Sequence, residues 1–103
     1  MSFHKDIAKT ADRIQEYINH TFIQYSPYLS KLNSGSVFLK LENTQKTGSF
    51  KFRGAYWRCM QLNHEEKNRG VVAFSSGNFA QALPVATSLV GTSAKIVLSL
   101  IHI

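Results

Sequence analysis

The sequence of 103 residues predicts an α/β fold built on a parallel sheet. Apolar residues recur at helical spacing in three separate stretches, and a short run typical of a strand follows each of them. The last two of these runs enclose a helical stretch, so that strand, helix and strand succeed one another within about thirty residues. Such a unit joins two parallel strands, and the whole order reads helix, strand, helix, strand, helix, strand.

The first predicted element is an amphipathic helix over residues 5–18. Its apolar positions lie three or four residues apart and would form one face of the helix: Ile7, Ala11, Ile14 and Ile18. The mostly polar residues 19–36 contain Pro27 and Gly35 and predict an irregular connection.

The middle of the chain predicts a strand, a helix and a charged turn. Residues 37–42 alternate well enough for a strand. A helix is expected to start after Ser49, because serine is a favoured N-cap, and apolar residues recur at helical spacing from 52 to 62. The charged residues 63–70 then predict a turn that ends at Gly70.

The last part of the chain carries the strand, helix and strand. Residues 71–74 predict a short strand buried on both faces. The helical stretch after it ends near Gly91, a natural C-terminal cap residue. Pro84 lies inside this stretch and predicts a kink, since proline in a helix costs ~3 kcal/mol. Residues 94–98 predict the final strand.

We expect residues 1–103 to be the incomplete, truncated N-terminal part of a larger domain. The length suits one small domain. Open parallel sheets usually carry more strands than this sequence supplies, and a bare edge strand is a liability.

Composition and charge restrict the function classes. The formal net charge is +6, from 12 Lys and Arg against 6 Asp and Glu, but these basic residues are spread along the chain, which disfavours nucleic-acid binding. A basic binding module remains as an alternative. The four histidines are scattered, so no metal site is expected, and Cys59, the single cysteine, is expected in the core. Since the chain has neither a membrane-length apolar run nor a signal peptide, we expect a cytoplasmic protein without membrane contact.

Lys51 lies between Phe50 and Phe52, directly after a Thr-Gly-Ser turn. A lysine amine forms a Schiff base with a carbonyl more readily when burial or a nearby positive charge lowers its pKa. The two phenylalanines could supply the burial, and Arg53 the positive charge. Taken alone, the pattern fits a surface lysine on an amphipathic helix better than a reactive one.

A second motif, Ser75-Ser76-Gly77-Asn78, lies where a predicted strand leads into a helix. Free N–H groups at a helix N-terminus attract carboxylate or phosphate, and open parallel sheets bind ligands at the carboxyl ends of their strands. The alternative is a capped turn without a ligand, and this motif alone favours that alternative.

Together the two motifs resemble a known family. LKLENTQKTGSFKFRGA (39–55), followed by SSGNFAQAL (75–83), resembles the pyridoxal-phosphate enzymes of the tryptophan-synthase-β fold type, and most closely the serine/threonine dehydratases and serine racemases. The resemblance covers roughly residues 15–98 and implies a parallel three-layer αβα domain, of which this chain is the first part.

The resemblance also implies residue roles and a reaction. Lys51 matches the lysine that holds pyridoxal phosphate, Phe50 the neighbour near the cofactor ring, and Asn78 the asparagine that binds the ring hydroxyl. The run from Ser75 to Asn78, with Gly77 in it, matches the loop that receives the substrate carboxylate, and Ser76 the second acid/base of racemases. The implied activity is an ammonia-lyase that converts L-serine or L-threonine to a 2-oxo acid and ammonia, in a homodimer.

Several departures keep alternatives open. His20-Thr21-Phe22 stands where the family usually has Thr-Pro-Leu, and Phe79 replaces the usual histidine. The family's glycine-rich phosphate loop does not occur within these residues. Alternatives are a non-catalytic remnant of such an enzyme, a serine racemase, or a chain that a second polypeptide completes; the chain alone is expected to be inactive.

Overall fold

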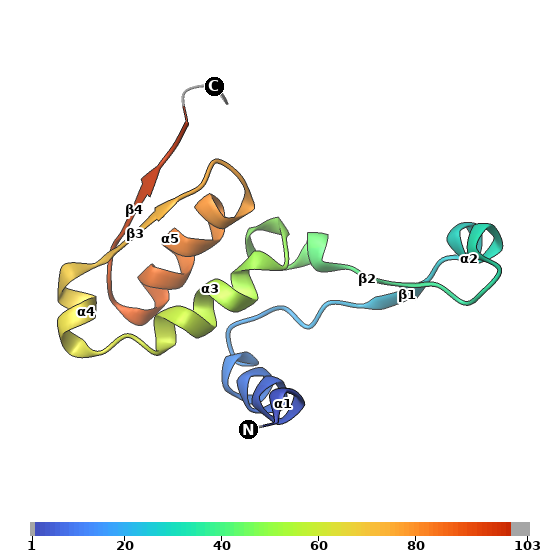
Figure 1. The fold of residues 1–103 in the computed structure, drawn as a ribbon, viewed down its shortest axis with the longest axis horizontal. Coiled ribbons are helices and arrows are strands. Elements are labelled where there is room, and N and C mark those ends of the chain that lie inside the picture. The colour runs from blue at the N-terminus through green and yellow to red at the C-terminus, as the bar shows by residue number, and fades with distance from the viewer. Residues whose placement is uncertain (1, 100–103) are drawn as a thin grey trace.

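The computed structural model describes residues 2–99, which form a mixed α/β structure (Figure 1). In chain order the elements are α1 (Phe3–Ile14), β1 (Ile23–Tyr25), α2 (Pro27–Asn33), β2 (Phe38–Lys40), two 3-10 turns η1 (Glu42–Thr44) and η2 (Lys46–Gly48), α3 (Lys51–Met60), α4 (His64–Arg69), β3 (Val71–Phe74), α5 (Asn78–Val90) and β4 (Ala94–Val97).

The predicted strand–helix–strand unit is confirmed. β3 and β4 pair in parallel, in a register that sets Val71 opposite Ala94 and Phe74 opposite Val97, and α5 connects them and packs on both. The prediction that β3 is buried on both faces is wrong. Val72 and Phe74 point away from α5 and are 68% and 73% exposed, because within residues 2–99 helices cover only one face of this pair.

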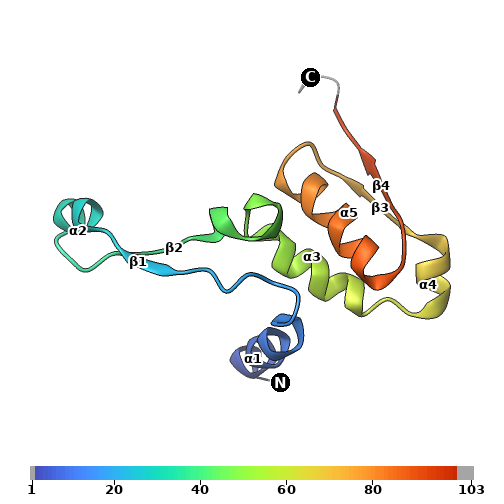
Figure 2. The same ribbon diagram turned by 180° about the vertical axis from the view of Figure 1, so that it is seen from behind.

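The core lies between α3 and α5, which run side by side with their N-termini at the same end (Figures 1 and 2). Phe52 and Tyr56 of α3 are buried, and their rings stack with centroids 5.9 Å apart. Cys59 is also in this core, as predicted, and its burial raises the pKa of the thiol. The facing side of α5 presents the small residues Ala82 and Ala86, which let the two helices approach closely.

Pro84 does not interrupt α5, which runs through from Asn78 to Val90. The proline lies on the exposed side, and its carbonyl accepts a hydrogen bond from the Thr87 hydroxyl at 3.0 Å. The predicted end of the helix is confirmed: Gly91 is left-handed with φ of 82°, and its N–H reaches the last carbonyls of α5.

The prediction of an irregular connection over residues 19–36 is wrong. Three residues in it form β1, which pairs antiparallel with β2, and seven form α2. α2 begins with Ser26 as N-cap, and the hydroxyl of Ser30 accepts the Val37 N–H at 2.8 Å to close the loop back to β2. This arm extends away from the α3–α5 core, with α2 at its tip (Figures 1 and 2).

The two remaining helices, α1 and α4, differ from the predictions. The bounds of α1 are shifted, and α4 was not predicted as a helix. α1 covers residues 3–14 rather than 5–18, and Ile14 is its buried anchor. α4 lies within the predicted turn 63–70, because Asn63 and Glu66 form a reciprocal capping box at its start.

Candidate functional site

The structure brings the two sequence motifs to one end of the α3–α5 pair. η2 leads into α3 and contacts α5, and the loop from β3 into α5 lies beside it in both views (Figures 1 and 2). Lys51 is the first residue of α3, and Asn78 is the first residue of α5. The candidate site therefore joins two helix N-termini at the carboxyl end of β3, where parallel sheets bind ligands.

The turn before Lys51 has an unusual backbone. Thr47 and Gly48 are both left-handed, with φ of 63° and 79°, and this conformation is a strained one for a β-branched residue. The Thr47 hydroxyl is buried and has no hydrogen-bond partner among the described residues. The predicted N-cap needs correction: Phe50 is the N-cap of α3, although the Ser49 hydroxyl still accepts the Lys51 N–H at 3.3 Å.

Lys51 is exposed, which is the surface position that its pattern alone favours, and the two phenylalanines do not enclose its amine within residues 2–99. Its Nζ lies 5.1 Å from the centroid of the Phe50 ring, which is itself 60% exposed. Phe52 points instead into the α3–α5 core. Adjacent residues on a helix face different directions, so one phenylalanine contacts the amine and the other cannot.

Arg53 does not supply a free positive charge either, because it is paired with Glu42. The Arg53 Nε donates to Glu42 Oε1 at 2.5 Å and Nη2 donates to Oε2 at 3.1 Å. Oε2 also accepts from the Thr21 hydroxyl at 2.5 Å and from the Gln45 amide at 3.5 Å. These bonds, above all those from Arg53, outweigh the effect of burial and lower the pKa of Glu42 to about 2.

The loop that enters α5 leaves its helix end open. The Ser75 hydroxyl accepts the Gly77 N–H at 3.4 Å, and Gly77 is the N-cap but brings no side chain to bond the first turn. Ser76 and Asn78 are exposed, and within residues 2–99 their side chains have no hydrogen-bond partner. The first N–H groups of α5 are thus directed at the space beside the loop, where a carboxylate or phosphate would be stabilised.

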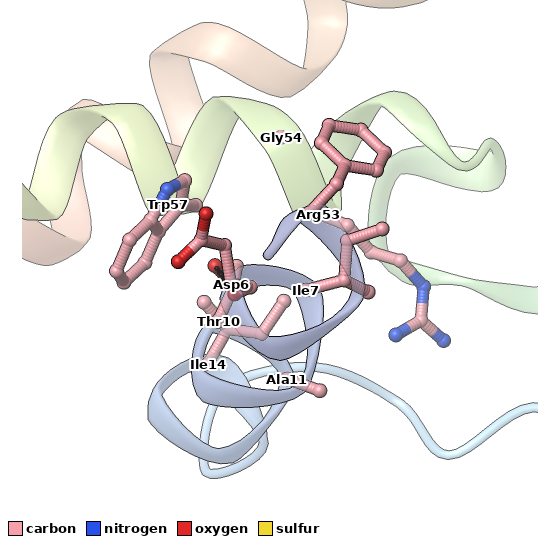
Figure 3. A pocket seen from close by; sticks show the side chains of 9 residues that line it. Asp6, Ile7, Thr10, Ala11, Ile14, Arg53, Gly54 and Trp57 are labelled. Atoms are coloured by element: carbon pink, nitrogen blue, oxygen red, sulfur yellow. Dashed lines mark hydrogen bonds between the residues drawn. The ribbon is translucent and has the colours of Figure 1, made fainter. Parts of the chain in front are cut away.

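An apolar hollow of the described surface lies elsewhere, between α1 and α3 (Figure 3). This groove of about 380 Å³ is lined by Ile7 and Ile14 from α1 and by Gly54 and Trp57 from α3. Figure 3 shows Arg53 at its end, with its side chain directed away from Trp57. Asp6 and Thr10 add polar groups to its lining, and the groove does not include Lys51.

The part of the chain that the structure describes contains neither a cluster of metal-ligating side chains nor a membrane-length apolar helix. No three His, Cys, Asp or Glu side chains gather there closely enough to hold a metal ion. Among the helices of residues 2–99, none has the length and apolar content needed to cross a membrane.

The residues present fit a cofactor that carries an aldehyde and anionic groups. Lys51 offers an amine that no carboxylate within residues 2–99 neutralises, and such an amine can condense with an aldehyde. The open end of α5 offers N–H donors for negative charge.

A protein-family model described as "Pyridoxal-phosphate dependent enzyme" matches residues 14–100. The chain belongs to this family. This family member is 44% identical over 94 residues to the L-threonine ammonia-lyase of Thermotoga maritima. The alignment covers 91% of this chain and 23% of that protein. The chain is 41% identical over 97 residues to the serine racemase of Schizosaccharomyces pombe, covering 94% and 30%.

Solved structures confirm the predicted fold class for this family member. The crystal structure of the serine racemase of Dictyostelium discoideum superposes with a TM-score of 0.83 at 39% identity, over 91% of this chain and 31% of that one. The mixed α/β chain therefore matches part of the tryptophan-synthase-β-like fold. It spans about a quarter to a third of the length of the relatives it matches.

Proposed function

We propose that the full-length form is a pyridoxal-phosphate-dependent ammonia-lyase that converts L-serine or L-threonine to a 2-oxo acid and ammonia. The observation that carries the proposal is the exposed amine of Lys51, at a helix N-terminus beside the open N-terminus of α5. Family membership and the similarity to a threonine ammonia-lyase support it.

Each residue of the two motifs has a role in this proposal. The amine of Lys51 would hold the cofactor covalently and, when free, would accept the α-proton of the substrate. The ring of Phe50 packs near the cofactor, and the side-chain amide of Asn78 donates a hydrogen bond to it. The loop residues Ser75, Ser76, Gly77 and Asn78 bind the substrate carboxylate.

When bound, pyridoxal phosphate supplies the electron sink that stabilises negative charge at the α-carbon. The protein supplies the base and the orientation. The α-proton would move to the amine of Lys51, and the resulting Lys51 ammonium would give a proton to the β-hydroxyl, which leaves as water. Hydrolysis of the product would then consume one water, so the balance is one hydroxy amino acid to one 2-oxo acid and one ammonia.

The cofactor part of the proposal is tested by reductive trapping. The chain is incubated with pyridoxal phosphate, reduced with borohydride and mapped by peptide mass spectrometry. The matched variants are Lys51→Ala and Lys95→Ala, since Lys95 is also exposed. Label concentrated on Lys51, lost in Lys51→Ala and kept in Lys95→Ala, supports the proposal. Label spread evenly over the eight lysines refutes it for this chain and favours a non-catalytic remnant.

A serine racemase is the second candidate, and the free hydroxyl of Ser76 favours it. Racemisation needs a second acid/base besides Lys51, and Ser76 lies on the loop beside the α3 N-terminus with no hydrogen-bond partner within residues 2–99. We expect Ser76→Ala in the full-length form to lower D-serine formation far more than ammonia release, since ammonia release loses only one contact to the substrate carboxylate. Loss of both activities in equal measure would contradict a separate racemase role.

The proposal extends to partners and location. A small hydroxy amino acid is the proposed substrate, a homodimer or a second polypeptide that completes the domain is the proposed assembly, and the cytoplasm is the proposed compartment. Sedimentation of the chain, alone and with a candidate completing polypeptide, tests the assembly.

A further inference from the structure

Hydrogen bonds hold the start of the turn that precedes Lys51, residues 45–50, in place. Gln45 is buried, and its Oε1 accepts the N–H of Asn19 at 2.8 Å and the N–H of Lys46 at 3.0 Å. Its Nε2 donates to the Asn19 carbonyl at 2.9 Å. One side chain thus ties the first residue of η2 to a chain segment 26 positions earlier.

The end of the same turn is held in place by the ion pair of Arg53 with Glu42. Arg53 belongs to the first turn of α3, two positions after Lys51, and its guanidinium forms two bonds with Glu42. Glu42 also bonds Thr21 and Gln45, so one carboxylate links both ends of the turn to the segment before β1.

The backbone between Gln45 and Arg53 includes a strained turn that needs stabilising contacts from the rest of the chain. Thr47 and Gly48 occupy left-handed conformations in succession, and the Thr47 hydroxyl is buried without a partner among the described residues. Strained backbone of this kind persists only where its surroundings over-determine it. Along residues 45–51 the hydrogen bonds are few, chiefly Gly48 N–H to the Gln45 carbonyl at 2.8 Å and Lys51 N–H to the Ser49 hydroxyl at 3.3 Å.

We propose that Glu42 and Arg53 are positioning residues that hold the strained turn and thereby fix the direction of the Lys51 amine for the cofactor. The inference rests on the proposed function, but its first step concerns only this chain. Neither Glu42 nor Arg53 forms a hydrogen bond or ion pair with Lys51 or with the loop 75–78; they act through the backbone of residues 45–53.

The first experiment measures amide hydrogen exchange by NMR in the cofactor-free chain. The variants are Glu42→Gln and Arg53→Met, and the matched controls are Glu65→Gln and Arg58→Met, exposed residues of α4 and α3. We expect exchange at Gly48 and Lys51 to rise about tenfold or more in the first two variants, since a charge-assisted bond is lost. Exchange in α5 and β3 should rise by no more than the loss of global stability accounts for, and the controls should match the wild type.

A milder variant keeps the inference testable if Glu42→Gln does not fold. Thr21→Val removes one hydroxyl bond to Glu42 and leaves every charge in place. It should raise exchange at Gly48 and Lys51 by a smaller factor, about threefold. Unchanged exchange at these two amides in every folded variant would overturn the inference.

The second experiment measures the ratio of borohydride-trapped label on Lys51 to that on Lys95, with each variant fully folded by circular dichroism. A merely structural role would shift the unfolding midpoint but leave this ratio alone. We expect the ratio to fall at least about fivefold in Arg53→Met and to stay constant in Arg58→Met. Uniform labelling of all lysines in the wild type would refute cofactor attachment at Lys51, and the exchange data would then decide the positioning role alone. Selective labelling of Lys51 that no variant alters would overturn the positioning role.

Discussion

The pairing of Glu42 predicts how the stability of the chain depends on pH. The Glu42 side chain is only 14% exposed, and the bonds from Arg53 lower the pKa of its carboxyl from 4.5 to about 2. A carboxyl whose pKa is lower in the folded chain than in the unfolded chain stabilises the fold above the unfolded value. That stabilisation is lost as the pH falls through the window from 4.5 to about 2.

The size of the effect follows from the pKa difference. Each unit corresponds to 1.36 kcal/mol, so the fall from 4.5 to about 2 contributes at most about 3 kcal/mol to the free energy of unfolding at neutral pH. Glu42→Gln removes this contribution. We expect the variant to be less stable than the wild type by about 2 to 3 kcal/mol at neutral pH and equally stable near pH 2.

Two measurements check the expectation. Carbon-detected NMR follows the Glu42 carboxyl directly, and its titration midpoint should lie near 2 in the wild type and rise toward 4.5 in Arg53→Met. Urea unfolding of wild type and Glu42→Gln across the same range gives the stability difference, in which the other carboxyls cancel. A wild-type midpoint near 4.5, or a stability difference that does not change with pH, would refute the reasoning.

Three further predictions concern packing, backbone and capping, and each is measured as a change in urea unfolding. Phe52→Ala should cost about 3–5 kcal/mol, because the ring is fully buried, whereas Phe50→Ala at the surface should cost less than about 1 kcal/mol. Gly70→Ala should lower the free energy of unfolding by about 1–3 kcal/mol, because φ is +80° and an added Cβ would lie 2.7 Å from Ser93 Oγ. Gly54→Ala should raise it by about 1 kcal/mol, because Gly54 lies within α3 and an added Cβ would have no atom within 4 Å. Asn63→Ala should cost about 1 kcal/mol through loss of the α4 cap, and an unchanged midpoint would contradict the capping box.

The elements that sequence predicted well are those whose signal is local. Apolar spacing in α3 and α5 and the short runs of β3 and β4 depend on residues close in the chain, and the structure confirms them. Gly91 ends α5 as expected because a left-handed cap is a property of one residue.

The elements that were not predicted from the sequence are β1, α2 and α4. β1 depends on pairing with a distant strand, whereas α2 and α4 begin with recognisable helix-start residues. β1 is only three residues long and exists through its pairing with β2, about fifteen positions away. The Pro27 start of α2 and the Asn63–Glu66 capping box of α4 were readable helix signals within stretches assigned to connections.

The chemistry was predictable in type and not in environment. The two motifs indicated an amine and an open helix end, and the fold brings those segments together. The exposure of Lys51 is the surface position that its pattern alone favoured. The engagement of Arg53 by Glu42 could not be predicted, since it follows from the direction in which α3 leaves its turn. Only the short sequence distance between Glu42 and Arg53, either side of the Thr47-Gly48-Ser49 turn, could have suggested the pair.

The parallel pairing of β3 with β4 also has a consequence in time. Only about twenty residues separate the paired positions, so the entropy lost on closing that loop is small, and α5 can form within it in about a microsecond. The arm of β1, α2 and β2 makes few contacts with the α3–α5 core and offers little to a folding nucleus. The second half of the chain should therefore organise first, and the strained turn before Lys51 should acquire its shape only when residues 19–21 reach an already folded α3.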